Sequence, residues 1–264
     1  MEVRGLRVEF DGRAAVDDVA FEIAPAEALG LVGESGSGKS TLARALLRLV
    51  PAARGTASLR GTDLLRCSGK ALRRRRRDLQ IVFQDPLASL DPRMTVGETL
   101  AQPLEIFEPQ LGKRERRARV AEMLERVGLE PAAARRYPHE FSGGQCQRIG
   151  IARAMMPRPL LLVCDEPVSS LDVSIQGQIV NLLSDLRRDL GTALLFISHN
   201  LAVVRHLSDR VMVMYGGRIV EIAERETLFA APVHPYTRAL LAAVPDPAAA
   251  LCPASGPLVY SNDR

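Results

Sequence analysis

Aromatic residues and cysteine are both scarce in this sequence, and tryptophan is absent. Phe, Trp and Tyr make up 4% of its 264 residues, whereas proteins that bind single-stranded nucleic acid stack bases on aromatic side chains. The four cysteines, Cys67, Cys146, Cys164 and Cys252, form no CxxC pair. This excludes a disulfide framework and a zinc-finger class, and it fits free thiols in a reducing compartment. We interpret Cys146 and Cys164 as packing residues.

Long hydrophobic runs are missing as well. Apolar stretches such as Leu160–Cys164 and Ala193–Ile197 are far shorter than the roughly 20 residues of a membrane-spanning helix. The first ten residues, MEVRGLRVEF, contain no apolar region of a signal peptide. We therefore expect a cytoplasmic chain that does not span the membrane.

Neither basic nor acidic residues predominate in the sequence. The formal net charge is +4, and part of the excess comes from five consecutive arginines, Arg73–Arg77. Such a run is able to bind nucleic acid or anionic lipid. Few aromatic residues lie near the run to stack on bases. We therefore interpret it as the solvated face of a short helix, and we expect no nucleic-acid partner.

Short apolar runs alternate with helical patterns, which is typical of α/β proteins. Strands are expected at Val8–Phe10, Ala20–Ile23, Ala28–Val32, Leu160–Cys164, Ala193–Ile197, Val211–Tyr215 and Ile219–Glu221. From Lys39 to Val50, before Pro51, apolar residues follow helical spacing. Between Pro86 and Pro159 strand signals are scarce, and Arg114–Val127 has a helical pattern. This middle segment is therefore predicted to be a mostly helical insert.

The segment Gly33-Glu-Ser-Gly-Ser-Gly-Lys-Ser40 matches the phosphate-binding pattern G-x-x-x-x-G-K-[ST] between an apolar strand and an amphipathic helix. Its backbone N–H groups and the helix N-terminus form a site for a phosphate. Lys39 is expected to reach the β- and γ-phosphates, and Ser40 to bind Mg²⁺. The predicted nucleotide-contacting residues here are Gly33, Glu34, Ser35, Gly36, Ser37, Gly38, Lys39, Ser40 and Thr41.

A second motif, Leu160-Leu-Leu-Val-Cys-Asp-Glu166, is an apolar strand that ends in two acids. The carboxyl ends of strands are where α/β sheets bind ligands. Asp165 suits a role in holding Mg²⁺, and Glu166 suits the orientation or deprotonation of an attacking water.

A third motif, Phe141-Ser-Gly-Gly-Gln145, opens another helix and forms a second anion-binding N-terminus. One chain does not need two phosphate sites for one ATP. The second site is explained if it covers a nucleotide held by another subunit.

The sequence resembles the ATPase subunits of ABC transporters, because five motifs occur in the order typical of that family. They are the phosphate-binding loop Gly33–Ser40 (the P-loop), FSGGQ, LLLVCDEP, SSLD and FISHN. The segments VFQDPLASLDPRMTVGETL and HPYTRALLAAVP narrow the resemblance to bacterial oligopeptide/dipeptide (peptide/nickel) permease ATPases, from about Met1 to Pro247. The implied fold is a P-loop NTPase of the ABC type, with a mostly parallel core sheet, an antiparallel β subdomain and a helical insert. The implied nucleotide-binding domain is 1–230 (core 1–85 and 158–230, helical subdomain about 86–157), followed by a short tail at 231–264.

The resemblance also implies roles for single residues. Gln84 would contact Mg²⁺ and the attacking water, His199 would bind the γ-phosphate, and Phe10 would lie under the adenine. The residues implied to act on the nucleotide of the opposite subunit are Ser142, Gly143, Gly144, Gln145 and Asp172. The implied catalytic set is Glu166, His199, Gln84 and Lys39, and the implied Mg²⁺ ligands are Ser40, Gln84 and Asp165.

The function implied by the resemblance is ATP hydrolysis coupled to import of oligopeptides or dipeptides. Expected partners are a second ABC ATPase subunit, in a homodimer or a heterodimer, two membrane permease subunits and, indirectly, an extracytoplasmic substrate-binding protein. The expected location is the cytoplasmic face of the plasma membrane, and the cofactors are ATP and Mg²⁺. Since the tail retains only Cys252, we expect no iron–sulfur cluster. Two alternatives stay open: an importer of nickel or metal chelates, and a non-transport ABC ATPase that acts on nucleic acid or ribosomes.

Overall fold

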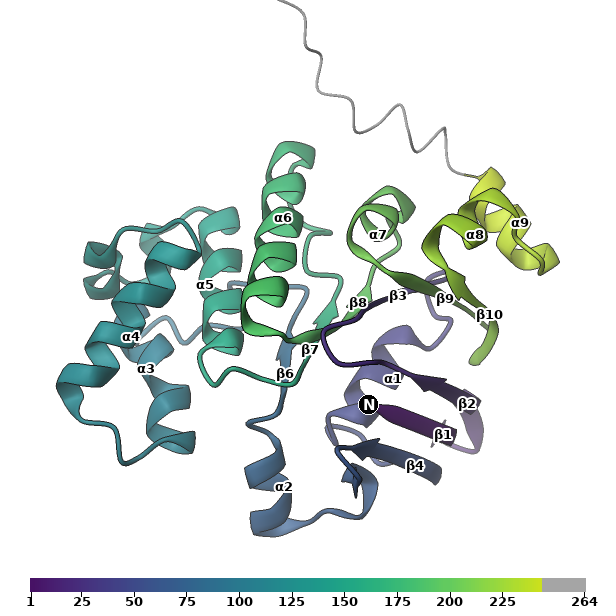
Figure 1. Cartoon of the computed structure of the whole chain (residues 1–264), viewed down its shortest axis with the longest axis horizontal. Helices are drawn as coiled ribbons and strands as arrows, with labels where there is room; N and C mark the ends of the chain where they lie inside the picture. The colour runs from purple at the N-terminus through teal and green to yellow at the C-terminus, as the bar shows by residue number, and fades with distance from the viewer. Residues whose placement is uncertain (244–264) are drawn as a thin grey trace, which may run out of the picture.

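The computed structural model describes residues 1–243, and two β-sheets organise this part of the chain (Figure 1). The larger sheet contains β3 (Ala28–Val32), β6 (Leu79–Val82), β7 (Leu161–Asp165), β8 (Ala193–Ile197), β9 (Arg210–Tyr215) and β10 (Arg218–Glu224). Its strand order is β10-β9-β3-β8-β7-β6, and every pair is parallel except β10 with β9. The smaller sheet, in the order β2-β1-β4-β5, is antiparallel. It contains β1 (Glu2–Phe10), β2 (Arg13–Glu22), β4 (Arg54–Leu59) and β5 (Thr62–Asp63).

Helices connect the strands and cover the larger sheet. They are α1 (Lys39–Leu46), α2 (Gly69–Arg75), α3 (Val96–Phe107), α4 (Lys113–Arg126), α5 (Gly143–Met155), α6 (Val173–Leu190), α7 (Leu201–Leu207), α8 (Arg225–Ala230) and α9 (Pro235–Ala242). Short 3₁₀ turns occur at Leu64–Arg66, Pro131–Arg135 and Pro138–Glu140. The expected α/β fold, with a mostly parallel core sheet and a smaller antiparallel sheet, is confirmed.

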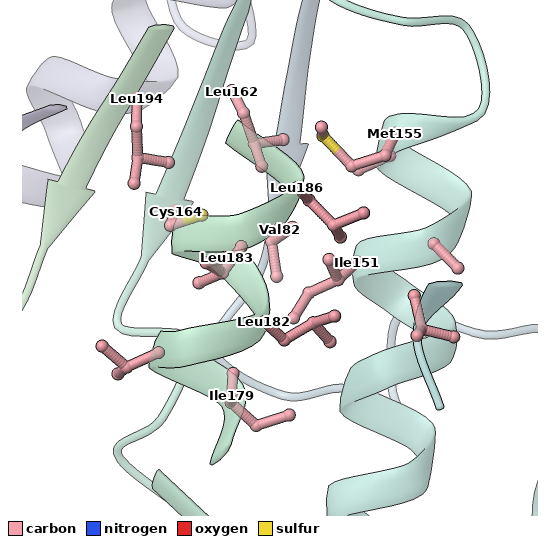
Figure 2. Close-up of a cluster of buried hydrophobic side chains, with 14 of the residues drawn as sticks. Val82, Ile151, Met155, Leu162, Cys164, Ile179, Leu182, Leu183, Leu186 and Leu194 are labelled. Carbon is pink, nitrogen blue, oxygen red and sulfur yellow. The ribbon is translucent and has the colours of Figure 1, made fainter. Parts of the chain in front are cut away.

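The central strands of the larger sheet are buried on both faces. Every residue of β3, β7 and β8 is buried, which explains their continuous apolar sequences. Alternate residues of β7 point to opposite faces. Leu161 and Val163 join the core with α1 and the smaller sheet, whereas Leu162 and Cys164 join the core under α5 and α6 (Figure 2). The interpretation of Cys146 and Cys164 as packing residues is confirmed, because both are fully buried.

The chain between β6 and β7 contains helices and no strand within the described residues. In α4, Val120, Met123 and Leu124 form the buried stripe that the helical spacing predicted. Helix α2, which contains part of the arginine run, has no buried residue, so the solvated-face interpretation is confirmed. Among the described helices, none is both long and apolar enough to span a bilayer.

One prediction about local structure was wrong, and three strands were missed. The helix expected to continue to Val50 ends at Leu46, because Arg48 adopts a left-handed backbone with φ +56°. The N–H of Leu49 then donates to the carbonyl of Arg44 at 2.8 Å, and Leu49 is half exposed. Strands β4, β5 and β6 were not predicted, since they are short and carry no clear alternation of apolar and polar residues.

Candidate nucleotide-binding site

The P-loop lies between the end of β3 and the start of α1, and it is packed closely against neighbouring strands. A Cβ on Gly38, whose φ is +104°, would lie 2.3 Å from the carbonyl oxygen of Ala15. A Cβ on Gly33 would lie 2.2 Å from the carbonyl oxygen of Met214. No residue with a side chain fits either position, so the motif glycines are required by this packing as well as by backbone conformation.

The loop forms one wall of a cavity of about 320 Å³. The cavity is lined by Ala15, Ser35, Gly36, Gly38, Lys39, Ser40, Thr41, Gln84 and Glu166. A Cβ on Gly36 would meet no atom within 4 Å, so the space above the loop is open. Backbone N–H groups at the start of α1 and an open space beside them fit the phosphates of a nucleotide.

Lys39 is buried, and its ammonium group donates hydrogen bonds to the carbonyl oxygens of Gly33 at 2.8 Å and Glu34 at 2.6 Å. Burial lowers the pKa of Lys39, and the nearby carboxylates of Glu166 and Asp165 oppose this effect. The lysine thus lies in the cavity wall with its charge directed to the P-loop backbone.

Ser40 and Asp165 meet at the carboxyl end of β7. The Ser40 hydroxyl donates to Oδ1 of Asp165 at 2.9 Å. Burial raises the pKa of Asp165, although the bond from Ser40 counteracts the rise. A hydroxyl and a carboxylate are the hard oxygen ligands that Mg²⁺ prefers, so these two residues fit the predicted metal site.

Glu166 adopts a left-handed backbone, with φ +51°, a conformation that is uncommon outside glycine. Its N–H donates to the carbonyl of Ile197 at 3.0 Å. Its Oε2 lies 3.2 Å from Nδ1 of His199, which follows β8. Gln84 follows β6 and lines the same cavity. The ends of three neighbouring parallel strands therefore bring Gln84, Glu166 and His199 together, as expected for ligand sites in such sheets.

The residues of the third motif, Phe141–Gln145, which we call the signature residues, do not line this cavity. Ser142 is the N-cap of α5, where its hydroxyl accepts from the N–H of Gln145 at 3.3 Å and its own N–H donates to the Gln145 side chain at 3.0 Å. Ser142 and Gln145 are exposed, as is Asp172 at the start of α6. A Cβ on Gly144 would lie 2.7 Å from Cγ2 of Ile175 in α6, so the starts of the two helices are in direct contact.

Phe10 ends β1, where it pairs with Arg13 across the hairpin, and it is 48% exposed. It is therefore not a core residue, and it does not line the cavity. Ala15, which the sequence analysis did not identify, does line it. No motif marks Ala15, because its position comes from the pairing of β1 with β2.

A second hollow, also of about 320 Å³, lies between α3 and the core. It is lined by Leu47, Leu49, Arg76, Leu79, Gln80, Ile81, Phe83, Gln102, Pro103, Ile106, Phe107, Arg153 and Ala154. Phe83, directly before Gln84, is 37% exposed there, and Ile106 is 44% exposed. We name this hollow the α3 groove. It places an apolar surface next to a residue of the nucleotide cavity.

Comparison with known families matches residues 16–169 to a model described as ABC transporter. Residues 220–255 match the oligopeptide/dipeptide transporter C-terminal region. The chain is 52% identical over 260 residues to the oligopeptide transport ATP-binding protein OppF of Salmonella typhimurium, with 94% of this chain and 78% of that protein covered. It is 54% identical over 252 residues to a putative peptide import ATP-binding protein of Brucella ovis, with 94% and 79% covered.

Two solved structures share the fold at 27% sequence identity. One is a dimeric post-hydrolysis state of the ATP-binding cassette MJ0796 bound to ADP and Pi, with a TM-score of 0.76 and coverage of 85% of this chain and 98% of that chain. The other is cbiO1 from Clostridium perfringens, part of the transporter complex cbiONQ, with a TM-score of 0.79 and coverage of 87% and 90%.

Proposed function

The chain belongs to the ABC transporter family, and we propose that it is the ATP-hydrolysing subunit of a bacterial importer of oligopeptides or dipeptides. The observation that carries this proposal is the cavity in which the P-loop, Gln84 and Glu166 converge. The choice of peptides as substrate is supported by the names of the relatives, which are oligopeptide and peptide import ATP-binding proteins.

In this proposal the P-loop and Lys39 bind the phosphates, and Ser40, Asp165 and Gln84 hold Mg²⁺. When bound, Mg²⁺ neutralises charge on the phosphate oxygens. Glu166 accepts the proton of the attacking water, and His199 hydrogen-bonds Glu166 and contacts the γ-phosphate. Phe10, exposed at the end of β1, stacks on the adenine.

The site of one chain is incomplete in this proposal. Ser142, Gly143 and Gln145 are exposed and Gly144 is half-buried, and all four lie outside the cavity of their own chain. They cover the γ-phosphate on a second ABC ATPase subunit, and Asp172 links the two sites. A donor to a developing negative charge typically contributes about 3–4 kcal/mol to the transition state. Hydrolysis therefore depends on closure of the dimer, which ATP favours through its contacts in the closed state.

The α3 groove is the proposed docking site for a cytoplasmic helix of a permease subunit. Exposed apolar residues, in a groove that Arg76 and Arg153 also line, suit an amphipathic helix. Because Phe83 lies in this groove next to Gln84, movement of the permease helix reaches the nucleotide cavity directly. The chain would thus associate peripherally with the cytoplasmic face of the membrane, while a substrate-binding protein delivers peptide from the other side.

Reconstitution tests this function. The chain, assembled with its permease subunits and second ATPase in proteoliposomes, should take up labelled di- and tripeptides with ATP, and Lys39→Ala in this chain should reduce both uptake and hydrolysis. ATP-driven uptake of nickel chelates without peptide uptake would favour the metal-importer alternative. Hydrolysis stimulated by ribosomes or RNA, with no uptake, would favour the non-transport alternative.

A further inference from the structure

Helix α9 brings one tyrosine into contact with the P-loop. The backbone N–H of Glu34 donates a hydrogen bond to the hydroxyl oxygen of Tyr236 at 3.0 Å. Tyr236 belongs to the C-terminal segment His234-Pro-Tyr-Thr-Arg238. No residue of α9 lines the nucleotide cavity, so the tyrosine acts on the loop and not on the ligand.

Tyr236 and Lys39 both hydrogen-bond to the peptide group that joins Gly33 and Glu34. The Glu34 N–H and the Gly33 carbonyl are two ends of the same peptide unit, and that carbonyl accepts from Nζ of Lys39 at 2.8 Å. A hydrogen bond at the N–H end polarises the peptide and strengthens its carbonyl as an acceptor. Tyr236, the Gly33–Glu34 peptide and Lys39 therefore form one hydrogen-bonded chain.

The structure holds Tyr236 in place from several sides. Its ring lies 4.3 Å from the ring of Tyr215, centroid to centroid, at 37°. Its N–H donates to Nδ1 of His234 at 3.2 Å. The carboxylate of Glu221 in β10 accepts from the N–H of Val233 at 2.8 Å and of His234 at 3.0 Å. These contacts fix the start of α9 to β10 and the tyrosine ring to the end of β9.

We propose that Tyr236 is a positioning residue for ATP binding: it holds the Gly33–Glu34 peptide so that its carbonyl keeps the Lys39 ammonium at the cavity. An ammonium group has three donors, and two of them are occupied by the Gly33 and Glu34 carbonyls. The third makes only a long contact, to the Ser37 hydroxyl at 3.4 Å, which a phosphate oxygen is able to replace. The inference rests on the proposed nucleotide site, and it gives the C-terminal region a role in nucleotide affinity.

Tyr236→Phe in the full chain tests the proposal, since it removes the acceptor and keeps the ring against Tyr215. One hydrogen bond corresponds to a weakening of about 3- to 10-fold, so we expect that increase in the Kd of the fluorescent nucleotide TNP-ATP and in the KM for ATP. The Kd of TNP-AMP and the kcat should stay within about twofold, because AMP does not reach Lys39 and saturating ATP restores its position.

Tyr215→Phe is the matched control. It removes a hydroxyl from the same aromatic pair, and that hydroxyl has no hydrogen-bond partner among residues 1–243, so nucleotide affinity should not change. Glu221→Ala releases the start of α9 and should weaken TNP-ATP binding as well. Combined with Tyr236→Phe it should add little, because both changes act through one contact.

Wild-type affinity for TNP-ATP in a folded Tyr236→Phe protein would overturn the proposal. Equal weakening of TNP-ATP and TNP-AMP would also overturn it, because that result describes general damage to the site. A wild-type chain that binds no TNP-ATP would instead refute the proposed nucleotide function itself.

Discussion

Glu166→Gln separates ATP binding from ATP hydrolysis in this site. Glutamine has nearly the same shape as glutamate, and both adopt the φ of +51° at position 166 at similar cost. The amide oxygen is still able to accept from His199, whose Nδ1 lies 3.2 Å from the carboxylate. The contacts of Lys39 and Ser40 are unchanged. We therefore expect ATP affinity to stay within about twofold of wild type.

Hydrolysis should change much more than binding. An amide does not accept a proton from water at neutral pH, and a positioned general base typically contributes a factor of about 10²–10⁴. This factor corresponds to about 3–5 kcal/mol in the activation free energy. Adding His199→Ala to Glu166→Gln should cause little further loss, because in the proposed mechanism the two residues act on the same water and phosphate, and such effects are not additive.

Single-turnover release of phosphate measures the chemical step in the assembled transporter, and TNP-ATP titration measures affinity. A Glu166→Gln protein that hydrolyses ATP within tenfold of the wild-type rate would refute the assignment of Glu166. A loss of affinity parallel to the loss of rate would also contradict it, because the side chain would then act in binding.

Four further predictions follow from the same geometry. Lys39→Ala should abolish micromolar ATP binding, and retained affinity in a titration would contradict its role. Asp165→Asn should raise the melting temperature of the nucleotide-free chain at pH 7. Burial raises the pKa of Asp165 in the folded chain. Its ionisation therefore destabilises the fold once the pH exceeds the pKa of aspartate in the unfolded chain, about 3.9. The increase in melting temperature caused by Asp165→Asn should accordingly become smaller towards pH 4. Ser142→Ala should preserve nucleotide binding at its own P-loop but lower turnover at least tenfold, measured by phosphate release. Phe10→Ala should weaken ATP binding about 5- to 100-fold if the ring stacks on adenine; unchanged affinity would remove Phe10 from the site.

The sequence predicted well where strand β3, the start of α1 and strand β7 lie, because local patterns determine them. A strand, glycines at close approaches and a helix start are all encoded within residues 28–46. The meeting of Glu166 and His199 also follows from sequence, since both follow predicted strands and parallel strands align their carboxyl ends at one edge. The place of Gln84 was implied only by the family resemblance, because β6 was not predicted. The positive φ of Glu166 and the end of α1 at Leu46 did not follow, because backbone conformations of single residues depend on their tertiary surroundings.

The sequence motifs did not predict contacts between segments that are distant in the chain. Nothing near Ala15 or Tyr236 indicates that the first reaches the nucleotide cavity and the second the P-loop, because both contacts arise from how the β1–β2 hairpin and α9 pack. The expected absence of an iron–sulfur cluster concerns Cys252, which lies outside the described residues, and most of the predicted 231–264 tail lies there too.

In the proposed mechanism, one chain holds only part of each ATP site, and a second ABC ATPase subunit completes it. The specific ATPase activity of the purified chain, alone and mixed with the second ATPase of its transporter, measured over a wide range of protein concentration together with the molar mass, tests this most directly. We expect specific activity to rise as dimers form with ATP and to fall towards zero on dilution. A monomer with constant specific activity at every concentration would contradict it.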